Sequence, residues 1–282
     1  MPSTFDAPLV AKQQLDGAYV LLTFRHPGVA REARPAQFVM MKAGTSSEPP
    51  LRRPFSLMAV DRAAETFTVF LKAVGAGSRA LSDLRPGEVA QCLGPLGRPF
   101  PDPPAGAEPL LVAGGYGIAP FLFLCAEKAG GARTPRVFYG GRGAGDLQLR
   151  DRFAAMGVPL LCSTDDGTLG HRGRVTEIVE QHLDTRPGPV VLYACGPDAM
   201  LHAVARVAER RALPAYVSLD PWMGCGVGTC LGCVVKIQRA EEERPKYRCA
   251  CTEGPVFEAA DVVWRGEDGS SARRAARREV GA

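Results

Sequence analysis

The stretch Leu110-Leu-Val-Ala-Gly-Gly-Tyr-Gly-Ile-Ala-Pro120 decides the fold of the middle of this chain. Its apolar start is typical of a buried strand, and it passes through a glycine-rich turn into an apolar, helix-like segment. A turn in this position can present backbone N-H groups to a phosphate, although it departs from the common Gly-x-Gly-x-x-Gly form. A plain strand-to-helix turn is the alternative interpretation.

The same alternation of strands and helices continues from about residue 108 to 215. Apolar runs recur with helix-like segments between them, and a helix is expected to begin near Pro197, where proline is tolerated in the first turn. This order predicts an α/β domain with a doubly wound, parallel sheet. The strand-like runs are Leu110–Ala113, Val137–Tyr139, Val158–Cys162 and Val190–Ala194.

Two more segments follow strands of this sheet, Ala194-Cys-Gly-Pro-Asp-Ala-Met200 and Ser163-Thr-Asp-Asp-Gly-Thr-Leu-Gly170. Ligands of open α/β sheets bind at the carboxyl ends of the strands, so we expect a dinucleotide there. Asp165 and Asp166 either accept hydrogen bonds from a ribose or only make a turn; as ribose ligands they favour NAD over NADP. The expected dinucleotide-binding residues are Gly114, Gly115, Gly117, Asp165, Cys195, Gly196 and Pro197.

From about residue 8 to 100, short β-rich runs separated by turn residues predict a small antiparallel β-barrel. The segment Arg98–Ala107 is rich in Pro and Gly and marks the boundary to the α/β domain. Arg53-Pro-Phe-Ser56 joins a cation, a rigid bend, an aromatic ring and a hydroxyl, which suit a flavin and its pyrophosphate or an ordinary strand start. Gly77 and Ser78, at an expected helix N-terminus, offer a second phosphate contact.

Near the C-terminus, Cys225, Cys230 and Cys233 have the Cys-x4-Cys-x2-Cys spacing of plant-type 2Fe-2S ligands. Glycines between and beside these cysteines allow positive φ angles and bring N-H groups close to sulfur. Structural zinc is the alternative, but zinc sites do not need such a glycine-rich loop. For the fourth ligand, spacing alone does not choose between Cys249 and Cys251.

Composition excludes several classes of protein. The chain has 282 residues, 46% of them hydrophobic, and a formal net charge of +4, so it can bury two ordinary cores while lacking the basic stripe of a nucleic-acid-binding protein. Scattered cysteines outside the array argue against a disulfide framework. The start lacks the pattern of a signal peptide, and glycines and prolines interrupt the uncharged run 109–126, so we expect a cytoplasmic protein without a membrane span.

These patterns predict three domains and a tail. They are a β-barrel with the candidate flavin-binding residues over residues 1–103, a dinucleotide-binding α/β domain over 104–215, a 2Fe-2S module over 216–265 and a flexible basic tail over 266–282.

Five short motifs occur in the order used by the ferredoxin-NADP reductase superfamily, which the chain resembles. They are Arg53-Pro-Phe-Ser56, Gly75-Ala-Gly-Ser78, Gly94-Pro-Leu-Gly97, Gly114-Gly-Tyr-Gly-Ile-Ala-Pro120 and Cys195-Gly-Pro197. With Met223-Gly-Cys-Gly-Val-Gly-Thr-Cys-Leu-Gly-Cys233 and Cys251-Thr-Glu-Gly-Pro-Val-Phe257, residues 8–264 look like the electron-transfer subunits of class 1B, NAD-dependent dihydroorotate dehydrogenases.

The resemblance implies cofactors and site residues. It implies Cys251 as the fourth cluster ligand, with Cys249 spare, and places Ser56 and Cys195, the candidate catalytic residues, at the contact between flavin and nicotinamide. The residues that it assigns to FAD are Arg53, Pro54, Phe55, Ser56, Phe70, Leu71, Lys72, Gly77 and Ser78.

The resemblance also implies a partner and a pathway. The partner is an FMN-containing dihydroorotate dehydrogenase catalytic subunit, in a heterotetramer with two copies of each chain. Electrons would pass from that FMN through 2Fe-2S and FAD to NAD, in de novo pyrimidine (UMP) biosynthesis.

The sequence is also compatible with three other functions. The nearest is an FAD and 2Fe-2S subunit of a ferredoxin-NADP oxidoreductase or sulfide dehydrogenase complex. A self-contained reductase with a diffusing acceptor is the second, and a colourless, zinc-bearing assembly factor is the third.

Overall fold

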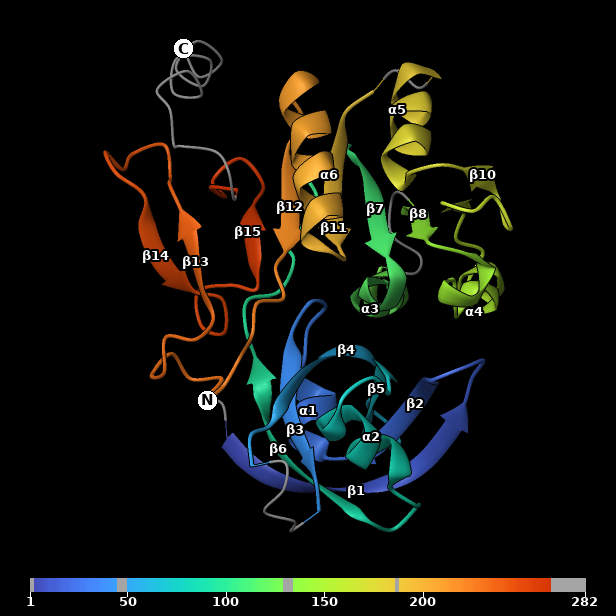
Figure 1. The fold of residues 1–282 in the computed structure, drawn as a ribbon, viewed down its shortest axis with the longest axis vertical. Helices are drawn as coiled ribbons and strands as arrows, with labels where there is room; N and C mark the ends of the chain where they lie inside the picture. Colours follow the sequence, from blue (N-terminus) through green and yellow to red (C-terminus); the bar gives the residue numbers. More distant parts are fainter. Residues whose placement is uncertain (1–2, 45–49, 129–133, 186–187, 265–282) are drawn as a thin grey trace.

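The computed structural model describes residues 3–44, 50–128, 134–185 and 188–264. Figure 1 shows a barrel built from the N-terminal third, an α/β domain above it, and a C-terminal hairpin beside the α/β domain. No helix in these ranges is long and apolar enough to cross a bilayer. The predicted basic tail, residues 266–282, lies outside the described residues.

The N-terminal strands close into the predicted antiparallel barrel in the order β1-β2-β5-β4-β3-β6. Its interior holds alternate side chains such as Leu22, Val39, Phe67 and Leu71, all nearly inaccessible to solvent, because successive residues of a strand point to opposite faces. The barrel elements are β1 (Ser3–Gln14), β2 (Tyr19–Arg25), α1 (Pro27–Glu32), β3 (Phe38–Ala43), β4 (Arg53–Asp61), β5 (Thr66–Lys72), α2 (Ala76–Asp83) and β6 (Val89–Leu96).

The second sheet has the order β10-β9-β8-β7-β11-β12-β15 in the described residues, and all its pairings are parallel except β12 with β15. This confirms the predicted doubly wound sheet. Its strands are β7 (Glu108–Gly114), β8 (Arg136–Gly141), β9 (Leu160–Thr164), β10 (His171–Arg172), β11 (Val190–Cys195), β12 (Ala215–Ser218) and β15 (Val256–Glu258).

Helices cover both faces of this sheet. Val112 and Leu192 pack with α5 and α6 in one core cluster, whereas Leu111 and Val191 pack with α3 in another. The second cluster also contains Tyr19 and Phe70 of the barrel, so apolar contact joins the two domains. The helices are η1 (Gly115–Ile118), α3 (Ala119–Glu127), η2 (Ala144–Asp146), α4 (Arg150–Ala155), α5 (Val175–Thr185) and α6 (Asp198–Arg210).

The cysteine-rich module shares a sheet and a hydrophobic core with the α/β domain. Its antiparallel hairpin consists of β13 (Val234–Ile237) and β14 (Lys246–Cys249), while β15 extends the α/β sheet. The strand β12 runs across the predicted boundary between residues 215 and 216. The division into domains at that position stays a prediction, because the module and the sheet share a core.

Candidate functional site: the edge of the α/β sheet and the cysteine loop

Two glycine-bearing turns meet at the carboxyl edge of the α/β sheet. The strands β7 and β11 are neighbours with Ala113 opposite Cys195, so Gly114–Ile118 and Cys195–Pro197 emerge side by side. A Cβ on Gly117 would lie 2.3 Å from the carbonyl oxygen of Cys195, and one on Gly114 would lie 2.7 Å from Cδ of Pro197. Glycine is therefore required at both positions for the turns to touch, and their predicted convergence is confirmed.

Cys195 lies at the end of β11, and Ser218, its partner on β12, forms a hydrogen bond with its thiol. Burial raises the pKa of the Cys195 thiol to about 12, so this side chain is a neutral thiol at physiological pH. A neutral, polarisable group suits close contact with a planar ring.

Asp220 stands two residues beyond β12 at the same edge, and sequence reasoning missed it. The residue is exposed. Desolvation of its carboxyl by the surrounding protein nevertheless raises the pKa to about 6, and the negative charge of Asp198 raises it further. Asp220 also acts electrostatically on Tyr116 and Cys195. Its position just after a strand of the same sheet was the signal that could have found it.

Arg53-Pro-Phe-Ser56 begins β4, and each of its residues pairs with β3: Phe38 lies opposite Ser56, and Met40 lies opposite Pro54. The Arg53 guanidinium donates to the carbonyl oxygens of Leu51 and Arg52, at 2.9 and 3.3 Å. These contacts keep a cation beside the start of the strand, in line with the predicted role in binding a phosphate.

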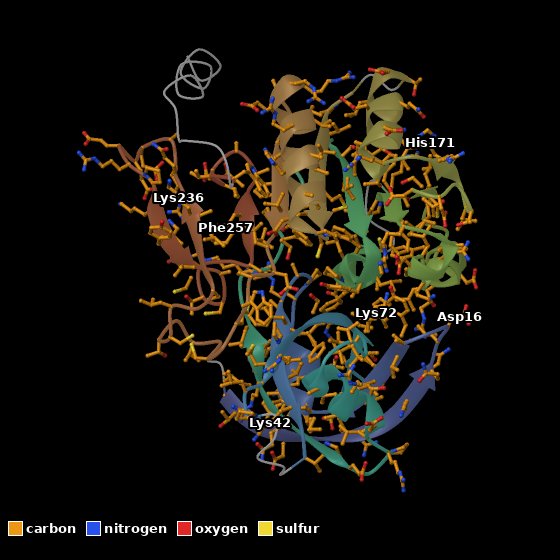
Figure 2. The ribbon with its side chains drawn as sticks, in the orientation of Figure 1. Asp16, Lys42, Lys72, His171, Lys236 and Phe257 are labelled. Carbon is orange, nitrogen blue, oxygen red and sulfur yellow. The ribbon has the colours of Figure 1, made fainter. Side chains whose placement is uncertain are left out.

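The three residues predicted on β5 point in different directions. Phe70 stacks on Tyr19, with ring centroids 5.4 Å apart, and faces the α/β domain. Leu71 belongs to the barrel core, so only its backbone can meet a cofactor. Lys72 donates to Asp146 of the α/β domain at 3.1 Å, and Figure 2 places it at the junction of the two domains.

Ser78 belongs to the first turn of α2, as predicted. Its hydroxyl accepts from the N-H groups of Val74 and Gly75 and donates to the carbonyl oxygen of Gly75. The side chain therefore shapes the turn, and the start of the helix supplies the partial positive charge that suits a phosphate. Gly77 is buried in the same turn.

The two aspartates after β9 have different surroundings. Asp166 accepts from the N-H and hydroxyl of Thr168 at 2.9 and 2.6 Å, and these bonds lower the pKa of its carboxyl. Asp166 thus stabilises a turn, which is one of the two roles predicted for this aspartate; the other was binding a ribose. Asp165 is exposed beside it, where its carboxylate is accessible to a ribose.

The cysteine loop has the predicted backbone. Gly226 and Gly228 have φ angles of 77° and 79°, and the N-H groups of Val227 and Cys230 donate to the Cys225 sulfur, both at 3.4 Å. Burial opposes ionisation of Cys225, but the backbone donors outweigh it and lower its thiol pKa to about 6. The expectation that glycines bring N-H groups to sulfur is confirmed, and such donors favour a thiolate ligand.

The fourth position also has a buried thiol. Cys251 accepts a hydrogen bond from the Gly228 N-H and forms another with Cys233, while burial raises its pKa to about 12. Within the described ranges, no three His, Cys, Asp or Glu side chains are grouped as ligands of a metal ion. A 2Fe-2S cluster needs only two cysteines on each iron, so four cysteines can hold it without any three of them meeting at one ion.

A separate cavity of about 640 Å³ lies between the linker after the barrel and the outer edge of the sheet. Arg98, Tyr216, Arg239 and Phe257 are among its lining residues, and the sequence-predicted site residues are not. The candidate site is therefore assigned to the carboxyl edge of the sheet and the cysteine loop, where the predicted residues lie, and not to this cavity.

Comparison with protein families supports both parts of the site. Residues 111–206 match the oxidoreductase NAD-binding domain, and residues 220–263 match the iron-sulfur cluster binding domain of dihydroorotate dehydrogenase B. The fold and the cysteine loop thus define a class, the NAD-linked flavin and iron-sulfur oxidoreductases.

Curated relatives identify the family. The chain is 37% identical over 264 residues to the dihydroorotate dehydrogenase B (NAD(+)) electron transfer subunit of Desulforamulus reducens, covering 94% of this chain and all of the relative. It is 39% identical over 234 residues to that of Bacillus caldolyticus, covering 82% and 87%. The chain belongs to the family of dihydroorotate dehydrogenase B electron transfer subunits.

Solved structures show the same architecture. An NADH-dependent reduced ferredoxin-NADP oxidoreductase superposes with a TM-score of 0.80 at 28% identity, covering 97% of this chain and 94% of that one. A ferredoxin NADP+ reductase from Neisseria gonorrhoeae, solved with FAD and NADP bound, superposes with a TM-score of 0.62 at 18% identity, covering 73% and 91%. The latter likeness concerns the fold alone.

Proposed function

We propose that this chain carries electrons from a dihydroorotate dehydrogenase catalytic subunit through a 2Fe-2S cluster and FAD to NAD, in de novo pyrimidine biosynthesis. When bound, the cluster supplies one-electron chemistry and the flavin converts it to two-electron chemistry. The chain's own task is to hold these groups close together and to tune their surroundings.

One observation supports this route most strongly: the cysteine loop packs directly on the barrel. A Cβ on Gly226 would lie 2.8 Å from Cγ of Met40 and 3.0 Å from Cδ1 of Leu96. Met40 of β3 lies opposite Pro54 in the Arg53-Pro-Phe-Ser56 strand. Paired residues of antiparallel strands are about 5 Å apart, so a single strand separates the cysteine loop from the proposed flavin strand.

The residues divide among the groups as follows. Cys225, Cys230, Cys233 and Cys251 would hold the cluster, and Ser56 and Cys195 would lie at the contact between flavin and nicotinamide. FAD would contact Arg53, Pro54, Phe55, Ser56, Phe70, Leu71, Lys72, Gly77 and Ser78. NAD would contact Gly114, Gly115, Gly117, Asp165, Cys195, Gly196 and Pro197.

The partner would be an FMN-containing catalytic subunit in a heterotetramer of two copies of each chain. Its docking surface would be the apolar side chains around the cysteine loop. Trp222 is 93% exposed, Leu231 61% and Val227 49%, and large apolar residues gathered at the surface mark interaction sites.

The test is an anaerobic absorption spectrum of the purified chain before and after NADH, with iron and acid-labile sulfide measured on the same sample. Flavin bands and a broad iron-sulfur envelope, both bleached by NADH, are expected. Addition of dihydroorotate dehydrogenase catalytic subunit and dihydroorotate should then reduce NAD. A colourless chain would refute the proposal.

A subunit of a ferredoxin-NADP oxidoreductase complex is the second candidate, favoured by the structural similarity at a TM-score of 0.80. It shares the cofactors but not the electron donor. NAD reduction that proceeds with ferredoxin and fails with the catalytic subunit and dihydroorotate would establish this alternative.

A further inference from the structure

The cysteine module contains five thiols where four would complete a cluster. Cys249 is the last residue of β14, buried two positions before Cys251. Its thiol and that of Cys251 both form hydrogen bonds with the Cys233 thiol. Cys249 therefore lies beside Cys233, one of the proposed ligands, and not elsewhere in the core.

Both thiols also contact the backbone of Gly228. Cys251 accepts from the N-H of Gly228, whereas Cys249 donates to the carbonyl oxygen of Gly228 at 3.9 Å. A thiolate ligand needs donors, and a protonated thiol needs an acceptor. Gly228 thus presents its N-H to Cys251 and its carbonyl oxygen to Cys249, which suits Cys251 as the ligand and Cys249 as a protonated thiol beside it.

The backbone between the two cysteines is short and anchored at both ends. The Ala250 N-H donates to the carbonyl oxygen of Cys233 at 3.0 Å, and the N-H groups of Thr252 and Glu253 donate to that of Cys249, at 3.2 and 2.8 Å. This turn keeps residues 249 and 251 beside Cys233. An exchange of one sulfur for the other requires side-chain rotation and a local shift of the turn, and the hairpin can stay in place.

We propose that Cys249 is a reserve ligand, which takes the fourth cluster position when Cys251 does not hold it. On binding iron, the Cys249 thiol would release its proton and its sulfur would replace that of Cys251, whose released thiolate would take up a proton, with no change in oxidation state. The inference rests on the proposed function, since it needs the cluster to be present.

The test uses the full chain, purified anaerobically, as wild type, Cys249→Ala, Cys251→Ala and the double variant. Alanine has no atom that could replace the sulfur. Iron and acid-labile sulfide per chain and the electron paramagnetic resonance spectrum after dithionite reduction are measured. Wild type and Cys249→Ala should have the same spectrum. Cys251→Ala should keep its iron with a shifted spectrum, and the double variant should lose it.

A Cys251→Ala chain as poor in iron as the double variant, with a melting temperature like that of wild type, would overturn the reserve role. Wild type without iron would instead refute the proposed function, so the two failures are distinguishable.

A second measurement avoids any variant that lacks Cys251. Iron release to a chelator should be several-fold faster from Cys249→Ala than from wild type, because a displaced Cys251 could no longer be replaced. Cys125→Ala, at a buried cysteine on α3, is the matched control and should release iron at the wild-type rate. Equal rates for Cys249→Ala and wild type would also overturn the inference.

Discussion

Lys72 of the barrel donates to Asp146 of the α/β domain at 3.1 Å, and the two residues are far apart in the chain. Tyr19 donates to the same carboxylate oxygen at 3.0 Å, and Arg142 pairs with the other oxygen at 2.8 Å. The hydrogen bond from Arg142, followed by those from Lys72 and Tyr19, holds the pKa of Asp146 far below its ordinary range. A polar contact of this kind fixes the domains on each other beside the proposed flavin site.

Asp146→Asn should lower the free energy of unfolding by about 2 kcal/mol at pH 7.5, since hydrogen bonds to a charged group are lost. The pKa of Asp146 is depressed in the folded state, so its contribution is present above the unfolded value of about 4 and is lost as pH falls. The difference in free energy of unfolding between wild type and Asp146→Asn, measured by urea denaturation, should therefore decrease as the pH is lowered toward 3.5.

Asp184→Asn is the control for this prediction, because Asp184 pairs with Arg211 at an exposed position. Exposed pairs contribute about 0 to 1 kcal/mol. Equal effects of the two substitutions at pH 7.5 would contradict a special role for Asp146.

Gly117→Ala should destabilise the chain by about 1 to 3 kcal/mol, the usual cost of overpacking. The new Cβ would lie 2.3 Å from the carbonyl oxygen of Cys195 and 2.8 Å from the Gly196 nitrogen, and backbone atoms do not move aside easily. Thermal unfolding measures the loss, and NADH should bleach the flavin more slowly because the two turns separate. Gly145→Ala, where the Cβ would meet nothing within 4 Å, should behave as wild type; a similar loss there would refute the steric explanation.

Asp220→Asn should gain stability relative to wild type as pH rises from about 4 to about 6. The Asp220 pKa of about 6 is raised by desolvation and by Asp198, so the folded state keeps a proton that the unfolded state releases near pH 4. Wild type therefore loses stability across this window, and the amide variant does not.

Urea denaturation at pH 4, 5 and 7.5 measures this difference, with Asp165→Asn as a control at the same edge of the sheet. A difference between wild type and Asp220→Asn that does not change with pH would mean that Asp220 titrates alike in both states.

Trp222→Asp combined with Leu231→Asp should weaken binding of the catalytic subunit by at least about tenfold, because removing buried anchors of an interface commonly costs 2 kcal/mol or more. Titration calorimetry measures the affinity, and the absorption spectrum shows whether the cofactors are retained. Met156→Asp is the control, since Met156 is 37% exposed at the end of α4, on the side of the molecule opposite the hairpin β13–β14 (Figure 1). Undiminished binding by the double variant would place the docking surface elsewhere.

Local pattern predicted much of this molecule. Most strand runs, the turn at Gly114–Gly117 and the Cys225 loop appear close to where the sequence placed them, because periodicity and glycine placement act over a few residues. The run predicted over Val158–Cys162 instead forms a strand over Leu160–Thr164. The convergence of the Gly114 and Cys195 turns was also predictable, since the carboxyl ends of parallel strands share one edge. The spacing of the cysteines likewise indicates an iron-sulfur module.

Other features depend on packing between distant segments. The pairing of Lys72 with Asp146, the extension of the α/β sheet by β15 and the raised pKa of Asp220 each join residues that no local pattern connects. Cysteine spacing could not predict that Cys251 contacts the N-H of Gly228 while Cys249 contacts its carbonyl oxygen, because both cysteines fit the position of a fourth ligand. The sequence by itself determined which elements and ligand types are present, because these follow from short-range periodicity and residue chemistry. Only the tertiary structure decided which side chains meet, because burial, hydrogen bonding and charge depend on neighbours brought together by the whole fold.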